Sequence, residues 1–263
     1  MIGRIWAIAL NTFREAARIR VLYGILVLVV GSNLLAILLG QLSLHESGRV
    51  ARDVGLAGIS LFGSLTAIFL GVFLLYTEVQ RRTIHAIVSK PIERWEFVVG
   101  KYLGMVLVLT VLVGVFALAM IAMLMVQGVG VSSGVVKAIA LSWMEVLLVA
   151  ALAIFFSSFS SPFLSGLFAL GLWVIGRLTP DLLGAVKVAK SVWIKWTATG
   201  ALKIVPDINL YAVSGTVVDG NHVSVHGDFV SWGYVAMATG YGLLWIAGLL
   251  GLAVAIFHKR DFV

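Results

Sequence analysis

The chain contains no cysteine among its 263 residues. This absence excludes a disulfide framework and a metal site built on thiolates. Charged residues are scarce as well, at 12% of the sequence, whereas about a quarter of the residues in a soluble globular domain are charged. Proline is rare, with four residues in the whole chain. A chain this poor in charge, with no covalent staple, depends on apolar packing and is not typical of a soluble protein.

Apolar residues take the place of the missing charges: they make up 61% of the sequence, and the mean hydropathy is +1.08. A helix needs about 20 mostly apolar residues to cross the hydrocarbon core of a bilayer. Five runs without Asp, Glu, Lys or Arg reach this length: residues 21–45, 54–77, 102–136, 146–176 and 229–257. The sequence therefore predicts an all-α, multi-pass membrane protein.

The fourth run is long enough for two helices if residues 138–145 are added in front of it. Ser157, Ser158, Ser160, Ser161 and Pro162 lie near its centre, and clustered serines with a proline favour a turn. We therefore predict six spans: residues 21–40, 56–77, 103–127, 138–160, 163–178 and 232–257.

The net charge of +7 comes from cations that flank the apolar runs. In this position they indicate membrane topology and contacts with anionic lipid, so no nucleic-acid partner is expected. With the N-terminus in the cytoplasm, eleven Lys and Arg residues lie inside and eight outside, four of the latter in one long external loop, residues 179–230. Both termini are predicted to be cytoplasmic, and the first run is kept as a span because it is longer than the apolar part of a signal peptide.

The N-terminal segment, residues 1–20, has two faces when drawn as a helix. Apolar residues such as Ile5, Trp6 and Phe13 lie on one arc, and Arg4 and Arg14 lie opposite. This pattern is typical of a helix that lies in the membrane interface.

The segment between the fifth and sixth spans, residues 179–230, is predicted to lie outside the membrane. It begins with an amphipathic pattern, and β-branched residues on both sides of Asp219 and Gly220 predict a hairpin. His222 and His226 would be about 13 Å apart on a strand, too far to share a metal ion. A partner protein on this side of the membrane is left open.

Glu145 is the only acidic residue inside a predicted span. Carboxylates in a membrane are candidates for function, although a structural hydrogen bond explains Glu145 as well. Lys137 lies eight residues away, about 12 Å along a helix, and is not expected to pair with it.

Residues 78–101 connect the second and third spans. Two short helical segments, 83–89 and 93–99, are separated by Lys90 and Pro91, and the residue before a proline is biased away from helix. Ile84, Ile87 and Val88 would form an apolar side with arginines at its rim. Such a compact knob suits docking into a groove on another protein. A solvated loop explains the arginines, but not the proline or the embedded apolar residues.

Several motifs in this chain resemble those of ABC-2 type transporter permeases. The connection carries Glu78, Arg82-Thr83, the segment Ser89-Lys90-Pro91-Ile92 with Arg94, and then Gly100-Lys101. The opening AsnThrPheArgGlu, the Ser-Ser-Pro hinge and the C-terminal PheHisLysArgAspPhe fit the same family. Arg82 departs from the pattern, because the family commonly has glycine there.

The resemblance implies one transmembrane domain over residues 1–263, forming a homodimer and coupled to a separate ABC ATPase that holds ATP and Mg²⁺. Residues 1–20 would be the elbow helix and residues 83–89 the coupling helix. The chain would be an exporter subunit in the inner membrane of a prokaryote. No catalytic, cofactor-binding or metal-binding residue is expected in it, and no GxxxxGK[ST] loop is present in the sequence. The residues expected to contact the ATPase are Glu78, Arg82, Thr83, Ile84, Ile87, Val88, Pro91 and Arg94.

Family analogy places the translocation path near spans one, two and five. The candidates to line it are Asn33, Ser60, Ser64, Thr66 and Glu145, although such residues also hydrogen-bond between helices in membranes. An alternative class remains open: a membrane anchor or assembly factor that recruits a soluble ATPase or enzyme without transport. An intramembrane enzyme is disfavoured because neither HExxH nor GxSxG occurs in the sequence.

Overall fold

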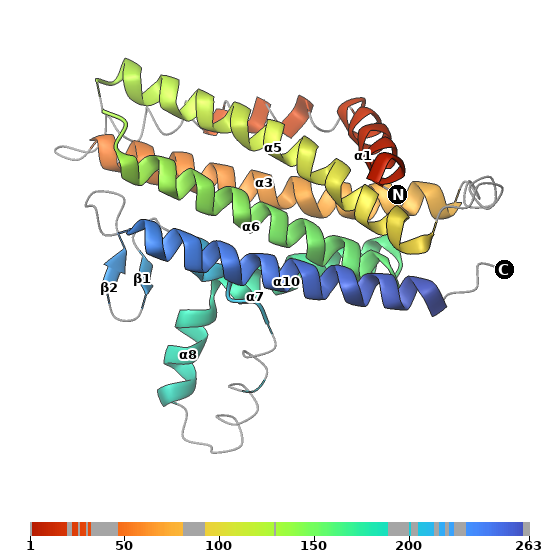
Figure 1. The fold of residues 1–263 in the computed structure, drawn as a ribbon. Helices are drawn as coiled ribbons and strands as arrows, with labels where there is room; N and C mark the ends of the chain where they lie inside the picture. Colours follow the sequence, from red (N-terminus) through yellow and green to blue (C-terminus); the bar gives the residue numbers. More distant parts are fainter. Residues whose placement is uncertain are drawn as a thin grey trace.

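The computed structural model describes residues 2–19, 23–25, 27–29, 31–32, 47–80, 93–128, 130–188, 200, 205–212, 216–218, 221–223 and 230–259. Four long helices form the body of the molecule and run side by side (Figure 1). They are α3 (Ser47–Gln80), α5 (Arg94–Val126), α6 (Ser133–Ser157) and α10 (Trp232–Lys259). Helix α6 is the central one, because 72% of its apolar stretch is buried, against 22% for α10.

Each of these four helices contains a stretch long and apolar enough to cross a membrane. A fifth crossing is possible only as a bent pair, in which α7 (Pro162–Arg177) and α8 (Thr179–Val188) meet at 65°. The described residues therefore contain four or five spans rather than six. The first predicted span, residues 21–40, lies largely outside them.

The turn predicted between the fourth and fifth spans is confirmed. Helix α6 ends at Ser157, and α7 begins with Pro162 in its first turn. Proline suits this position because the first N–H groups of a helix have no partner within the helix. In Figure 1, α8 projects away from the bundle instead of continuing along it.

Helix α1 (Ile2–Ala17) shows that the N-terminal segment is helical, whereas its position in the membrane interface stays a prediction, and it packs against the first turns of α5. Gly100 and Gly104 permit the approach: a Cβ atom at Gly104 would lie 2.5 Å from Thr12 Cβ, and one at Gly100 would lie 2.8 Å from Ile8 Cβ. Ala9, Thr12 and Ala16 are buried by this packing. Small residues four positions apart are a common way for helices in membranes to approach closely.

The start of α5 corrects one prediction. The predicted short helix at residues 93–99 is not a separate element, because α5 runs unbroken from Arg94. The backbone N–H of Glu93 donates to Glu96 Oε2 at 3.4 Å, so the side chain in the first turn satisfies a backbone group at the new helix start. The other predicted short helix, residues 83–89, lies outside the described residues.

The segment between α8 and α10 contains the 3₁₀ turn η1 (Ile208–Tyr211) and two short strands. Strands β1 (Thr216–Val218) and β2 (Asn221–Val223) pair antiparallel, with Val218 opposite Asn221, which confirms the predicted hairpin. The hairpin lies at the end where α3, α6 and α10 begin (Figure 1). Helix α1 and the last turns of α10 lie at the opposite end, so both ends of the described chain are on one side of the bundle.

Candidate functional site

Glu145 lies in the middle of the central helix and is fully buried. Its neighbours along α6 are mostly apolar, and the alanines, leucines and methionine among them favour helix. These apolar side chains offer the carboxylate no hydrogen bond. A buried carboxylate is strongly unfavourable unless hydrogen bonds and an opposite charge compensate it. Glu145 therefore needs hydrogen-bond donors and a positive charge beside it.

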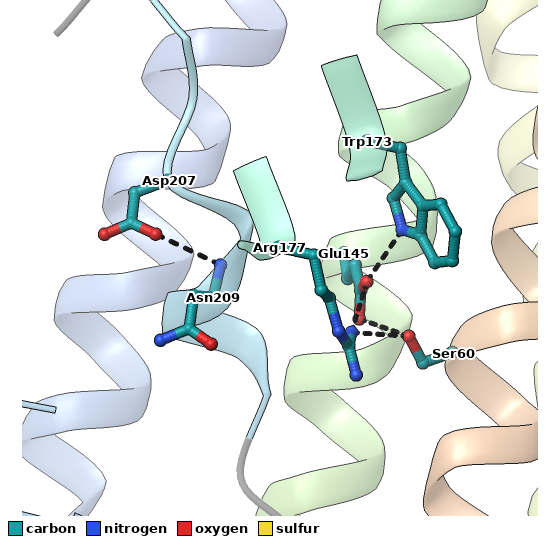
Figure 2. Close-up of polar contacts among 6 residues, drawn as sticks. All are labelled: Ser60, Glu145, Trp173, Arg177, Asp207 and Asn209. Carbon is teal, nitrogen blue, oxygen red and sulfur yellow. Dashed lines mark hydrogen bonds and ion pairs between the residues drawn. The ribbon is translucent and has the colours of Figure 1, made fainter. Parts of the chain in front are cut away.

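Three side chains donate hydrogen bonds to the Glu145 carboxylate, and they come from two other helices (Figure 2). Ser60 Oγ of α3 donates to Oε2 at 2.8 Å, and Trp173 Nε1 of α7 donates to Oε1 at 3.0 Å. Arg177 Nη1 donates to Oε1 at 2.6 Å and forms an ion pair with it. The same nitrogen donates to Ser60 Oγ at 2.7 Å. We call Ser60, Glu145, Trp173 and Arg177 the Glu145 cluster.

The hairpin of α6 and α7 explains why Glu145 and Arg177 meet. Each lies sixteen residues from Ser161, the residue that precedes α7, so antiparallel helices bring them to the same level. Trp173 is four residues before Arg177 and therefore lies on the same face of α7. The sequence thus folds the acid and the base against each other through a local turn, and α3 adds the serine.

The turn η1 closes one side of the cluster. Tyr211 Oη donates to the carbonyl oxygen of Ala238 in α10 at 3.0 Å, and burial, aided by the nearby Tyr241 and Glu145, raises the pKa of this phenol. Two glycines permit the contact: a Cβ at Gly242 would lie 2.5 Å from Tyr211 Oη, and one at Gly176 would lie 2.6 Å from Pro206 O. Tyr211 therefore stays protonated and holds η1 on α10.

A small cavity of about 10 Å³ remains between the cluster and η1, which is room for about one water molecule. It is lined by Leu56, Ser60, Ala138, Ser142, Glu145, Arg177, Tyr211 and Ala212. Five of these eight residues are polar: Ser60, Ser142, Glu145, Arg177 and Tyr211.

A second set of charges lies at the start of α5, where the helix follows the predicted coupling segment. Lys101 Nζ lies 3.5 Å from Glu15 Oε2 of α1, and Arg4 Nη1 lies 3.9 Å from Glu96 Oε2. Lys101 and Glu96 are both buried. Helix α1 is therefore attached to the base of α5 by opposite charges as well as by the two glycines.

Among the residues that the structure describes, no group of three or more His, Asp or Glu side chains could hold a metal ion. The Glu145 cluster binds together three helices through one paired acid and base. A family model described as "ABC-2 family transporter protein" matches residues 6–262.

This chain belongs to the ABC-2 transporter family. A comparison with curated proteins gave no significant match. Members of the family are membrane transport components, so the ABC-2 assignment agrees with the apolar helices of the bundle and makes this a multi-pass membrane protein.

The structure of this ABC-2 family protein brings together two of the five residues predicted near the path, Ser60 and Glu145. Thr66 Oγ1 donates to the Phe62 carbonyl oxygen of its own helix at 2.6 Å. Ser64 Oγ is buried without a hydrogen-bond partner in the described part of the chain. Asn33 lies outside the described residues.

Most residues predicted to contact the ATPase cannot be placed. Arg94 is exposed at the first position of α5, next to the coupling segment. Glu78 belongs to the last turn of α3. The others lie outside the described residues: Arg82, Thr83, Ile84, Ile87, Val88 and Pro91.

Sequence reasoning for this ABC-2 protein missed Arg177, Trp173 and Tyr211 as site residues. It placed Arg177 at the end of the fifth predicted span and counted it only among the external charges. A signal was available for Arg177: Glu145 and Arg177 flank the charge-free run 146–176 on its two sides, and a turn at its centre must bring them together. The expectation that Lys137 does not pair with Glu145 is confirmed. Lys137 Nζ donates to the Val230 carbonyl oxygen at 2.8 Å and lies 5.4 Å from the centre of the Trp232 ring.

Proposed function

We propose that this chain is the membrane permease subunit of an ABC exporter, works as a homodimer, and is driven by a separate ATP-binding subunit. The observation that carries the proposal is the family match over residues 6–262, nearly the whole chain. ATP and Mg²⁺ would be bound by the partner, and this chain would supply the path through the inner membrane of a prokaryote, with both termini in the cytoplasm.

The base of α5 supports a route for the mechanical signal. The predicted coupling segment leads directly into Arg94, and α1 is fastened to the next two turns through Lys101 and Gly104. A push on that segment would therefore move α1 and α5 as one unit. Helix α5 spans the full bundle and carries the displacement to the other side.

The Glu145 cluster supports a second part of the mechanism. Helix α7 buries only Ser165, Ala169 and Gly176 of its sixteen residues, and Leu170 and Leu172 also pack against the core. Its side-chain hydrogen bonds to the other helices come from Trp173 and Arg177 near its C-terminal end. A helix whose polar bonds are concentrated at one end can move when that end is released. We propose that the cluster keeps α7 against α3 and α6 in one state of the transport cycle.

The test is to express the chain together with the ATPase encoded beside it and to purify both in detergent. Co-elution in equal stoichiometry, with ATP hydrolysis that depends on this chain, is the expected result. Co-elution without any substrate-stimulated or proteoliposome transport activity would instead favour the anchor or assembly-factor function. A monodisperse chain that never binds the ATPase would contradict the permease proposal.

A further inference from the structure

We propose that Arg177 and Ser142 form a binding site for a phosphate oxygen, which enters the cavity between α3, α6, α7 and η1. The site would take a phosphate-bearing molecule, either a lipid headgroup or a free phosphate. Binding itself does not depend on the proposed export function. Only the step that would make such a molecule the transported substrate rests on that function.

The first argument is the geometry of the Arg177 guanidinium. Its bonds to Glu145 and Ser60 both come from the single nitrogen Nη1. Nη2 and Nε donate to no residue that the structure describes, and Figure 2 shows the second terminal nitrogen pointing away from both partners. The side chain is 26% exposed, so these donors are not sealed in the core. An arginine normally uses its planar fork to bind two oxygens, and here half of the fork is unused.

The second argument is the hydrogen-bonding capacity of the other groups at the cavity. Glu145 already accepts three hydrogen bonds. The Asp207 carboxylate accepts from the backbone N–H of Asn209 at 3.1 Å, and it is turned away from Arg177 in Figure 2. The hydroxyl hydrogen of Tyr211 is committed to Ala238. The carboxylates near the cavity therefore have their donors, and the unused charged donor is the guanidinium.

Ser142 supplies a second donor. It lies on α6 almost one turn before Glu145 and lines the cavity. Ser142 is buried, with 5% of the residue exposed. Its hydroxyl makes no hydrogen bond to any residue in the described ranges. The cavity has room for about one oxygen atom. A single acceptor oxygen on a larger molecule therefore fits the space that Arg177 and Ser142 both line.

The third argument concerns the kind of oxygen. Hydrogen bonds from a guanidinium to an anionic oxygen are about twice as strong as those between neutral groups. Among anions, phosphate is the one that the bilayer itself presents next to membrane-spanning helices.

The experiment measures the thermal stability of the purified chain, without ATPase, in a neutral detergent. The probes are dihexanoyl phosphatidylglycerol, inorganic phosphate, and dihexanoyl glycerol as the phosphate-free control. Arg177→Lys keeps the charge but removes the fork, and Ser142→Ala leaves the Glu145 pair untouched. The control variant is Arg14→Gln, which removes an exposed arginine on α1.

Concentration-dependent stabilisation by the phosphatidylglycerol is expected, with a half-maximal concentration raised tenfold or more by Arg177→Lys, several-fold by Ser142→Ala, and unchanged by Arg14→Gln. Stabilisation by phosphatidylglycerol alone identifies a lipid headgroup, and stabilisation also by inorganic phosphate shows that free phosphate is sufficient. No stabilisation by either probe, equal stabilisation by dihexanoyl glycerol, or unchanged binding in both site variants overturns the proposal. None of these outcomes bears on the ATPase, so the failure of this site and the failure of the export function are distinguishable.

Discussion

At the scale of single residues, Glu145 decides the energetics of the bundle. Its carboxylate is fully buried, and the charge on Arg177 and the donors on Ser60 and Trp173 replace the water that it lacks. Removing one partner of such a pair leaves an uncompensated charge, which costs more than removing both.

We therefore predict that Arg177→Met lowers the free energy of unfolding by about 3–5 kcal/mol, because Glu145 is left buried and charged. The double variant Arg177→Met with Glu145→Gln should recover at least half of the loss. Unfolding by SDS in mixed micelles measures both. If the double variant is as unstable as the sum of the single variants, the two side chains are not coupled.

Two serines on α3 provide a matched comparison. Ser60→Ala removes a donor to Glu145 and should cost about 1–3 kcal/mol, because the carboxylate loses one of its hydrogen bonds. Ser64→Ala removes a buried hydroxyl that has no partner in the described chain, and it should cost little. The same SDS titration compares them, and equal losses would contradict the assignment of Ser60 to the cluster.

At the scale of helices, the close approach of α1 and α5 depends on two positions without a side chain. Gly104 faces Thr12 and the Ala9 carbonyl oxygen, and Gly100 faces Ile8. The approach also brings Lys101 beside Glu15. Attachment of α1 thus combines shape with charge, as the proposed joint movement of α1 and α5 requires.

Gly104→Leu should separate α1 from α5 and expose the N-terminal helix to protease, because no side chain fits between the two helices. Gly114→Leu on the same helix is the control, since nothing lies within 4 Å of a Cβ atom there. Limited proteolysis with N-terminal detection measures the effect. Equal resistance of the two variants to protease would show that α1 is held by other contacts.

The elements were largely predictable from the sequence, and the site was only partly so. Hydropathy located the bodies of α3, α5, α6 and α10, because 20 apolar residues in a row are a strong signal. It missed where α5 begins, because Arg94, Glu96 and Lys101 are charged, and the partners of Glu96 and Lys101 on α1 are far away in the sequence. It singled out Glu145 and Ser60, but it counted Arg177 only as an external charge at the end of the fifth predicted span, because cations are used to mark where spans end.

At the scale of the whole molecule, the absence of cysteine makes the topology directly testable. We predict that a single cysteine at Gly128, in the loop between α5 and α6, reacts with a membrane-impermeant maleimide in intact spheroplasts. A single cysteine at Gly3 on α1 should react only after lysis. The reverse pattern would place the termini outside.

The proposed coupling between the permease and its ATPase partner can be tested at the coupling segment. Ile87→Asp should release the ATPase from the membrane while the permease stays folded and inserted, because it places a charge on the predicted apolar side of the coupling segment. Arg14→Gln on α1 serves as a control with a similar change in charge. Membrane fractionation and blotting of the ATPase measure the result, and undiminished recovery of the ATPase with the Ile87 variant would contradict the docking role.

The length of α7 has a consequence for the lipid around the protein. Its sixteen residues rise about 24 Å, whereas the hydrocarbon core is about 30 Å thick, and the chain bends by 65° directly afterwards. The membrane must become thinner beside α7, or the helix end with Arg177 must be reached by water from above. The mismatch between α7 and the bilayer thickness would then affect the activity of this protein. In vesicles of shorter-chain phosphatidylcholine the ATPase-coupled transport proposed for this chain should rise, and in longer-chain vesicles it should fall.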